Sequence, residues 1–352
     1  MNKPSQDFLK ALLETPSPSG YEQPAAKLWR DYIKDSVDEL IPDVHGNSIA
    51  VLNPKAEFKF MLAGHIDEIG LMITHVDEKG YIYTAQIGGM DPSLLVGQRV
   101  IIMNEKGPVL GVIGRKAIHL MQPDERKKGV EMENIWVDIG SGSKKEAEKR
   151  VSVGDPMVID VASRTLNGDK IVSRATDDKA GAFIVAEVLK ALSKKKLNIS
   201  VIGVATVQEE IGLRGAITSA YRVNPQAAIA IDVTFASDHP ETDPKKIGTV
   251  KLGSGPVLHR GPNINPIIEK ELFKIAKAKK IPYQLTAEAR ATGTDANAIQ
   301  LSRGGAATGL ISIPNRYMHT PVEVISTKDL DNCIKLITEF LAAHPANRDY
   351  RP

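Results

Sequence analysis

The amino-acid sequence predicts an α/β fold, in which a mixed, mostly parallel β-sheet lies between layers of helices and carries an inserted β-rich domain. Three observations predict this arrangement. Apolar strand-like segments alternate with amphipathic helical segments over residues 1–70 and 162–352, a pattern typical of a largely parallel sheet covered by helices. Residues 71–161 instead contain strand-like segments in succession. Several of the apolar strands also end directly in acidic residues or histidine.

The composition limits the classes of function. A net charge of +2 over 352 residues provides no strong field for nucleic acid or for an anionic membrane. The single cysteine, Cys333, allows no internal disulfide bond and favours a reducing compartment. No apolar segment approaches the roughly 20 residues that cross a bilayer, and the N-terminus lacks an apolar signal core. We therefore expect a cytoplasmic protein with no nucleic-acid or membrane partner.

The first 70 residues predict two helices followed by three strands. Apolar residues recur with helical spacing in two segments, which the proline- and serine-rich breaker Thr15–Gly20 separates. The apolar run that follows stops abruptly at His65, as a buried strand would. The expected elements are helices over 5–13 and 22–34, two short strands over 37–52 and a strand over 58–65.

Residues 71–161 predict a small β-rich domain inserted into the larger one. Five strand-like segments follow each other, with turn signals such as Glu78–Gly80 and Glu105–Gly107 between them. Only one convincing helix is expected here, in the sequence KKEAEKR after Ser143. The polar and charged segment 121–133 is expected to be a long mobile loop.

Strands and helices alternate again from the turn at Asn167–Asp169 to the C-terminus. The most informative strand is 201–207, an apolar and largely β-branched run that ends in the adjacent acids Glu209 and Glu210. The other expected strands are 171–175, 227–233, 281–286 and 306–313, and the expected helices are 182–192, 216–221, 265–280, 295–303 and 327–343.

Five strand ends carry side chains of the types that can bind metal ions: His65, Asp177, Glu209–Glu210, Asp232 and His319. Because ligand sites in open α/β sheets lie at the carboxyl ends of the strands, we expect these side chains to converge. Two imidazoles and several carboxylates form a ligand set for divalent transition metals, large enough for two ions that share a carboxylate. Adjacent acids such as Glu209 and Glu210 can have two different roles, one binding a cation and the other transferring a proton.

Each of these residues alone also has a structural explanation. A strand-end histidine is often only a hydrogen-bonded structural residue, and Asp177–Asp178 before a helix can cap it and neutralise its dipole. The pair Glu209–Glu210 can belong to a solvated turn, Asp232 can cap the next element, and His319 can brace Pro321. The coincidence of five such strand ends favours a metal site over these separate explanations.

Six motifs, in this order along nearly the whole chain, carry a family resemblance. They are Gly64–Gly70 (GHIDEIG), Ala175–Gly181 (ATDDKAG), Val207–Gly212 (VQEEIG), Ile231–Asp232, Gly293–Ala296 (GTDA) and His319–Glu323 (HTPVE). Together they resemble the M42 family of metalloaminopeptidases, which includes tetrahedral, glutamyl and deblocking aminopeptidases and some endoglucanase-like proteins. The resemblance implies a phosphorylase/hydrolase-like catalytic domain, formed by residues 1–70 and 162–352, and a PDZ-like dimerisation domain at 71–161.

The resemblance also implies a role for each candidate metal ligand. Asp177 would bridge two divalent ions, zinc or cobalt. His65 and Asp232 would complete one metal site, and Glu210 and His319 would complete the other.

Further residues take supporting roles by the same resemblance. Glu209 would be the general base, Asp67 would orient His65, and Asp178 would be a supporting acid. No ligand is altered in this chain. The mild departures from the family pattern are Gly64 in place of a frequent alanine, Thr320 in place of a frequent serine, and Asn297 and Gln300, which leave the substrate preference open.

The function implied is a binuclear metal-dependent aminopeptidase that removes N-terminal residues from peptides by metal-activated water, assembled from dimers into a tetrahedral dodecamer. Rival activities with similar machinery are those of a carboxypeptidase, dipeptidase or deacetylase. An endoglucanase activity is less consistent with the ligands, because most glycosidases use two carboxylates without a binuclear metal centre. A non-catalytic peptide-binding or assembly scaffold would be expected to lack a ligand or the base, whereas all six positions are filled.

Overall fold

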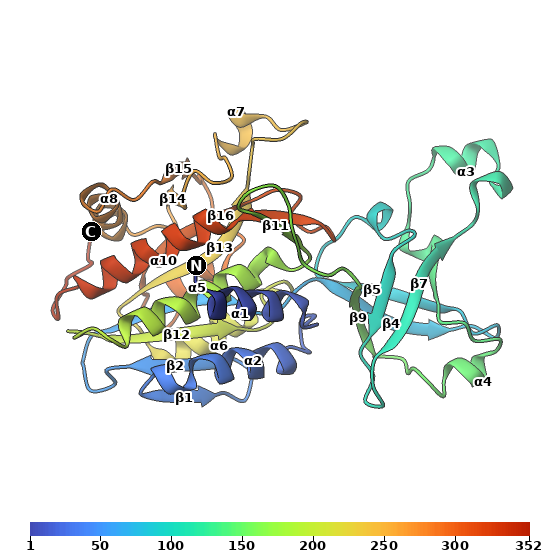
Figure 1. Ribbon diagram of the computed structural model, residues 1–352, viewed down its shortest axis with the longest axis horizontal. Helices are drawn as coiled ribbons and strands as arrows, with labels where there is room; N and C mark the ends of the chain where they lie inside the picture. The colour runs from blue at the N-terminus through green and yellow to red at the C-terminus, as the bar shows by residue number, and fades with distance from the viewer.

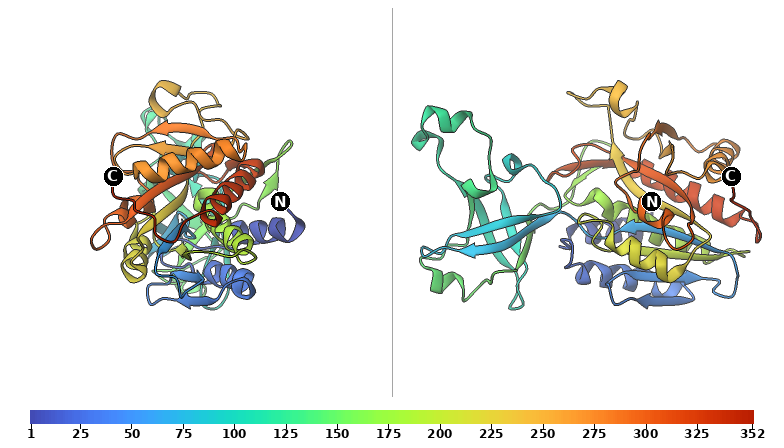
Figure 2. Two further views of the ribbon diagram at one scale, coloured as in Figure 1. Left: turned by 90° about the vertical axis from the view of Figure 1, so that its left-hand side faces the viewer. Right: turned by 180° about the vertical axis from the view of Figure 1, so that it is seen from behind.

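The computed structural model describes all 352 residues and has two parts joined by a narrow connection (Figure 1). The larger α/β part contains both the N- and C-terminal segments of the chain, and the smaller β part is formed by the middle of the chain. The view from behind in Figure 2 shows the same separation. The predicted fold class, an α/β domain with an inserted β-rich domain, is confirmed.

The larger part is built on an eight-stranded mixed sheet. In spatial order its strands are β1 (Glu39–Pro42), β2 (Ser48–Leu52), β12 (Ser200–Thr206), β3 (Lys59–His65), β13 (Ala227–Phe235), β16 (Ala307–Asn315), β14 (Val257–Arg260) and β15 (Gln284–Ala287). The central strands β12, β3, β13 and β16 run parallel to each other, and β2 and β14 flank them in the antiparallel sense. Thr206 pairs with His65, so the segments that follow β12 and β3 leave the sheet at the same level.

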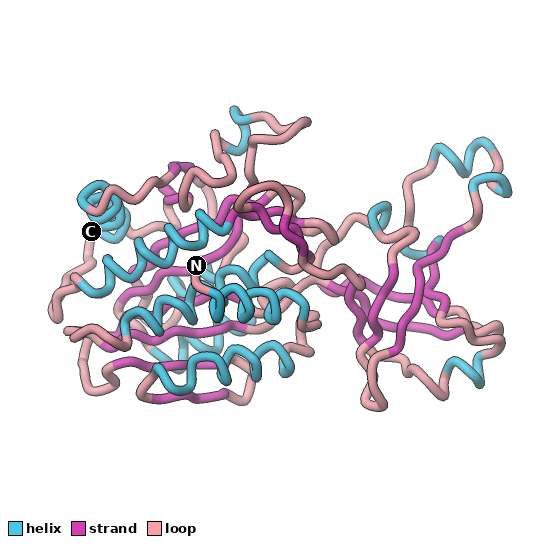
Figure 3. The backbone as a smooth tube through the Cα atoms, in the orientation of Figure 1, coloured by secondary structure: helices cyan, strands magenta, loops and turns pink.

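Helices cover both faces of this sheet (Figure 1 and Figure 3). One face packs against α1 (Lys3–Glu14), α2 (Gln23–Ile33), α5 (Thr176–Leu192), α8 (Pro266–Ala278) and α10 (Thr327–Ala342). The other face packs against α6 (Arg214–Val223) and α9 (Asp295–Gln300). Trp29 and Phe183 are fully buried in the larger core, and the Trp29 indole donates a hydrogen bond to the carbonyl of Ala182 at 2.8 Å. The remaining helix, α7 (Pro244–Ile247), is a single turn in the segment between β13 and β14.

A small three-stranded sheet lies beside the start of α5. Its strands are β10 (Arg164–Thr165), β11 (Lys170–Ser173) and β17 (Glu323–Ser326), in that order. The antiparallel pairing of β11 with β17 places Ser173 opposite Glu323. The start of α5 therefore lies beside the residues that follow β16, although the two segments are far apart in the sequence.

The smaller part is a closed six-stranded barrel with its own apolar core. Around the barrel its strands are β4 (Gly70–Val76), β5 (Ile82–Ile87), β8 (Ile135–Asp138), β7 (Val109–Arg115), β6 (Arg99–Ile102) and β9 (Pro156–Ile159). The helix expected after Ser143 is α4 (Lys144–Ala147), and the Ser143 hydroxyl oxygen caps it by accepting the backbone N–H of Glu146.

The segment 121–133, expected to be a long mobile loop, is not a loop throughout. This segment contains the short helix α3 (Pro123–Lys127), whose N-terminus carries a capping box formed by Gln122 and Glu125. Glu125 also pairs with Lys116 at 2.8 Å, so part of this charged segment takes part in local structure. No helix in the structure is long and apolar enough to span a bilayer.

Candidate metal centre

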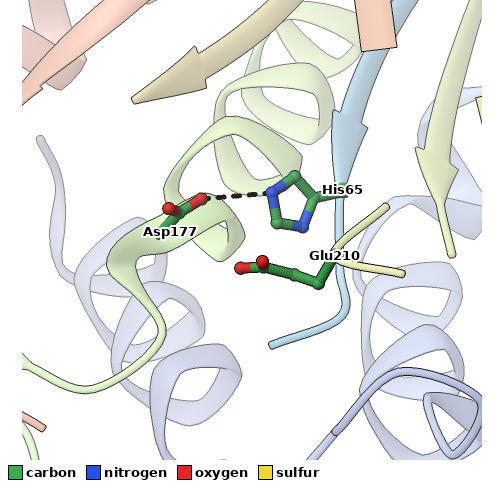
Figure 4. Close-up of side chains that lie close together, drawn as sticks. All are labelled: His65, Asp177 and Glu210. Carbon is green, nitrogen blue, oxygen red and sulfur yellow. Dashed lines mark hydrogen bonds and ion pairs between the residues drawn. The ribbon is translucent and has the colours of Figure 1, made fainter. Parts of the chain in front are cut away.

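The predicted site residues converge at the carboxyl edge of the central strands. His65 is the last residue of β3, and Asp232 lies within β13. Glu209 and Glu210 follow β12, Asp177 lies at the start of α5, and His319 lies in the loop between β16 and β17. Figure 4 shows His65, Asp177 and Glu210 pointing toward one another from three separate elements.

The carboxylate of Asp177 lies between two imidazoles. Its Oδ1 is 3.1 Å from Nε2 of His65, and its Oδ2 is 3.4 Å from Nε2 of His319. Nε2 of His319 is also 3.5 Å from Oε2 of Glu210. Because each oxygen of Asp177 faces a different histidine, this carboxylate has the placement that a ligand shared by two cations requires.

Two groups of side chains have the spacing of metal ligands. One consists of His65, Asp177 and Glu210, and the other of His65, Asp178 and Asp232; the ligand atoms within each group lie within 4.8 Å of one another. The structure therefore groups Asp232 with Asp178, whereas the family resemblance pairs Asp232 with Asp177. Asp178 also accepts the backbone N–H of His65 at 3.2 Å, so it contacts the ligand-bearing strand directly.

Both histidines are oriented through their Nδ1 atoms. Nδ1 of His65 lies 3.2 Å from the carbonyl oxygen of Asp67 and 3.5 Å from its carboxylate. Nδ1 of His319 lies 2.7 Å from the carbonyl oxygen of Gly89, which belongs to the inserted part of the chain. A proton on Nδ1 that is donated to these oxygens leaves the Nε2 lone pair directed at the acidic cluster, as in metal-binding histidines.

A further buried acid, Glu323, holds two of the candidate ligands through their backbone. Its Oε2 accepts the backbone N–H of Asp177 at 3.0 Å and the hydroxyl of Thr176 at 2.9 Å. Its Oε1 accepts the backbone N–H of His319 at 2.9 Å. Sequence reasoning quoted Glu323 within a motif but assigned it no role, because a hydrogen bond from a residue 146 positions away leaves no local signal.

Burial makes the acids of this cluster resist ionisation. Burial, reinforced by neighbouring acids such as Asp232, raises the pKa of Glu209 to about 10. Burial and the charge of Asp177 raise the pKa of Glu210 and of Asp232 to about 8. Asp177 differs: burial alone would raise its pKa, but in the absence of cations hydrogen bonds from the protonated imidazoles of His319 and His65 outweigh burial and lower it.

Such a cluster fits a divalent cation. A cation that binds here replaces the repulsion between ionised carboxylates with attraction, and the mixture of imidazole nitrogen and carboxylate oxygen suits transition metals. The donor set of the structure therefore agrees with a metal site, on chemical grounds alone.

Comparison with known proteins identifies the family. The model of the M42 glutamyl aminopeptidase family matches residues 46–336. The chain belongs to this family. It is 38% identical to the lysyl aminopeptidase of Pyrococcus furiosus over 95% of this chain and 96% of the relative.

Two solved structures support the assignment. The structure of the TET aminopeptidase from a marine sediment archaeon, Thaumarchaeota archaeon, is 34% identical, covers 97% of this chain and 96% of its own, and superposes with a TM-score of 0.93. The Pyrococcus horikoshii TET1 peptidase, which assembles into a tetrahedron or a large octahedral shell, is 32% identical over 96% and 99% of the two chains, with a TM-score of 0.85. As a member of the M42 family, the protein is a metal-dependent peptide-bond hydrolase.

A cleft of about 650 Å³ opens in front of the centre of this M42 enzyme. Its lining includes Glu209, His259, Glu288 and Asn297. A much smaller pocket of about 30 Å³ is lined by Asp177, Glu210 and His319 together with apolar residues of the barrel, among them Leu71, Met157 and Ile159. Of these two spaces, the cleft alone is larger than a few water molecules.

The departures from the M42 pattern have local explanations. A Cβ at Gly64 would lie 2.5 Å from the backbone carbonyl carbon of Gly181 in α5, so this chain has no room for alanine there. Asn297 and Gln300 both accept hydrogen bonds from the amide of Asn263, at 3.4 and 2.9 Å. Of these two, Asn297 lines the cleft.

Proposed function

We propose that this enzyme removes N-terminal residues from peptides with the help of two divalent cations, zinc or cobalt. The observation that carries the proposal is the position of Asp177, with one carboxylate oxygen facing His65 and the other facing His319. In this proposal Asp177 is shared between the cations, His65 and Asp232 complete one site, and Glu210 and His319 complete the other. Bound cations would supply a Lewis acid for the scissile carbonyl and would lower the pKa of a bound water.

We propose Glu209 as the general base. Its Oε2 lies 3.9 Å from Nε2 of His65, it lines the cleft, and it belongs to neither group with metal-ligand spacing. A carboxylate in that position can accept a proton from the attacking water and return it to the departing amine. Without cations, burial raises the pKa of Glu209 to about 10, and bound cations would lower it, so that the carboxylate could accept the proton in the first of these steps.

We further propose that the enzyme forms a homo-oligomer from dimers, with residues 71–161 as the dimerisation domain and a tetrahedral dodecamer as the final assembly. The support is the high structural similarity to TET peptidases that form shells. The barrel also exposes apolar side chains on β7, where Leu110 and Val112 are 65% and 49% exposed. Sedimentation or light scattering of the purified protein tests this assembly.

We also propose that the enzyme acts in the cytoplasm. Its single cysteine is buried and has no disulfide partner, which is consistent with a reducing compartment.

Paired peptides that differ only at the N-terminus test the activity. We expect peptides with a free N-terminus to lose their first residue, their N-acetylated counterparts to remain intact, and a chelator to abolish turnover until divalent metal is restored. Cellulose serves as the substrate for the rival endoglucanase activity. Cleavage of the acetylated peptides, release of C-terminal residues, or activity that survives complete metal removal would refute the proposal.

A further inference from the structure

Two buried acids hold three consecutive backbone N–H groups in the turn that carries the candidate base. Glu22 accepts the N–H of Gln208 at 3.1 Å, and Asp67 accepts the N–H groups of Glu209 and Glu210 at 3.0 and 3.2 Å. In each case the acceptor comes from a part of the chain more than one hundred positions away. The turn after β12 is therefore held by hydrogen bonds to acids from distant parts of the chain.

The conformation of this turn requires such support. Gln208 has a φ of 55°, in the left-handed region that side chains other than glycine rarely adopt. A conformation of this kind is energetically unfavourable and persists where surrounding contacts determine it. The hydrogen bond from Gln208 to Glu22 fixes the peptide group of the strained residue directly before Glu209.

Glu22 has no evident role in its own helix. It precedes α2 and is 3% exposed, but its side chain does not cap the helix. Its Oε1 atom accepts both the N–H of Gly20, at 2.6 Å, and the N–H of Gln208. No lysine, arginine or histidine pairs with Glu22, and its charged neighbour is the acid Asp67. A carboxylate is costly to bury, and the contact with the turn accounts for its presence.

We propose that Glu22 is a positioning residue that fixes Glu209 through the backbone of Gln208. The proposal rests on the proposed role of Glu209 as the general base. Asp67 holds the same turn, but it also contacts His65, so its removal would disturb the metal centre and the base together. Glu22 contacts none of the candidate ligands, which makes its contribution separable from metal binding.

Replacement of Glu22 by alanine should loosen the turn without removing a ligand. Since a displacement of about 1 Å can lower a rate by about 10²-fold, we expect Glu22→Ala to lower kcat by about tenfold or more. KM should change less than kcat, and the metal content should equal that of the wild type. Steady-state kinetics on a free peptide, together with metal analysis of the same preparation, measures these quantities.

Two conservative variants distinguish the effect of the length of the Glu22 side chain from the effect of its negative charge. Glu22→Gln keeps a single acceptor oxygen at the same reach, and since one oxygen serves both N–H groups, kcat should stay close to that of the wild type. Glu22→Asp keeps the charge but is one methylene shorter, so kcat should fall as in Glu22→Ala. This pair decides the proposal even if the alanine variant does not fold.

Asp329 provides a matched control. It is buried and also accepts two backbone N–H groups, from Gly253 and Gly255, at 2.7 Å each. Asp329→Ala should lower Tm and leave kcat unchanged, because these glycines lie outside the cleft.

Three results would overturn the proposal: an unchanged kcat in Glu22→Ala and Glu22→Asp, a loss of metal that parallels the loss of rate, or a Glu22→Gln variant as slow as Glu22→Asp. Failure of the underlying function is distinguishable from these results, because the wild-type enzyme would then release no N-terminal residue from any peptide.

Discussion

The carboxylate of Asp67 accepts the backbone N–H of Glu209 at 3.0 Å, although the two residues are 142 positions apart in the sequence. The same relationship recurs around the centre: Asp178 accepts the N–H of His65, and Glu323 accepts the N–H groups of Asp177 and His319. Buried acids therefore hold the backbone of the ligand-bearing segments, while the ligand side chains themselves remain directed at the cluster.

Glu209→Gln should keep its metal and lose its turnover. The amide has a similar shape but cannot accept the proton, and a general base contributes a factor of about 10²–10⁴ to the rate. Metal analysis and kcat on a free peptide check both statements. A variant with full metal content and a near-normal rate would exclude Glu209 as the base.

His319→Ala should lose one of two bound cations. His319 is one of two imidazoles that face Asp177, so its removal leaves one proposed site with carboxylates alone. The measurement is the metal-to-protein ratio after dialysis. His75→Ala is the control, because His75 is exposed on the barrel strand β4 and should leave the ratio unchanged. An unchanged ratio in His319→Ala would remove His319 from the ligand set.

Glu323→Ala should weaken metal binding by about 10–100-fold, as expected for partners that orient metal ligands. In contrast to Glu22, the glutamine variant should not restore function. Glu323 accepts hydrogen bonds with both oxygens, and glutamine offers only one acceptor. Titration with a competing chelator measures the affinity. Equal affinities in the wild type and in both variants would show that Glu323 has no influence on the ligands.

Stability should depend on pH through His259. This imidazole is buried between the hydroxyl groups of Ser312 and Thr286, and burial lowers its pKa to about 4. In the folded state it stays neutral below pH 6.5, where the unfolded chain takes up a proton. Its contribution to stability is therefore complete above pH 6.5 and is lost as pH falls toward 4.

His259→Gln should remove this dependence. Between pH 7.5 and pH 5, the free energy of unfolding of the wild type should fall by about 2 kcal/mol more than that of the variant. Urea unfolding at the two pH values measures the difference, in which the contributions of other titrating groups cancel. A constant difference between wild type and variant would contradict the assignment.

Strands with strong apolar patterns were predictable, and so was the edge where they end. The segments expected at 58–65, 201–207 and 227–233 are the central strands β3, β12 and β13, because buried parallel strands are continuous apolar runs. The four-residue strands β14 and β17 were not predicted, since runs that short show no periodicity and depend on pairing with distant strands.

The supporting contacts of the centre could not be predicted from local patterns. Glu22 precedes a helix, where an acid is ordinarily interpreted as favourable to the helix dipole, yet its carboxylate contacts Gln208 across 186 positions. The grouping of Asp178 with Asp232 depends likewise on how α5 meets the sheet. Such contacts follow from the tertiary fold, so only the three-dimensional structure reveals them.

The pairing of β11 with β17 has a consequence for synthesis of the protein. It brings the start of α5 to Glu323, and His319 lies just before that strand, so the centre depends on residues translated near the end of the chain. Domains begin to fold from the N-terminus while the ribosome is still elongating them. A nascent chain can thus form β3 and β12 early without a complete centre. Peptidase activity would therefore arise only after translation is nearly finished.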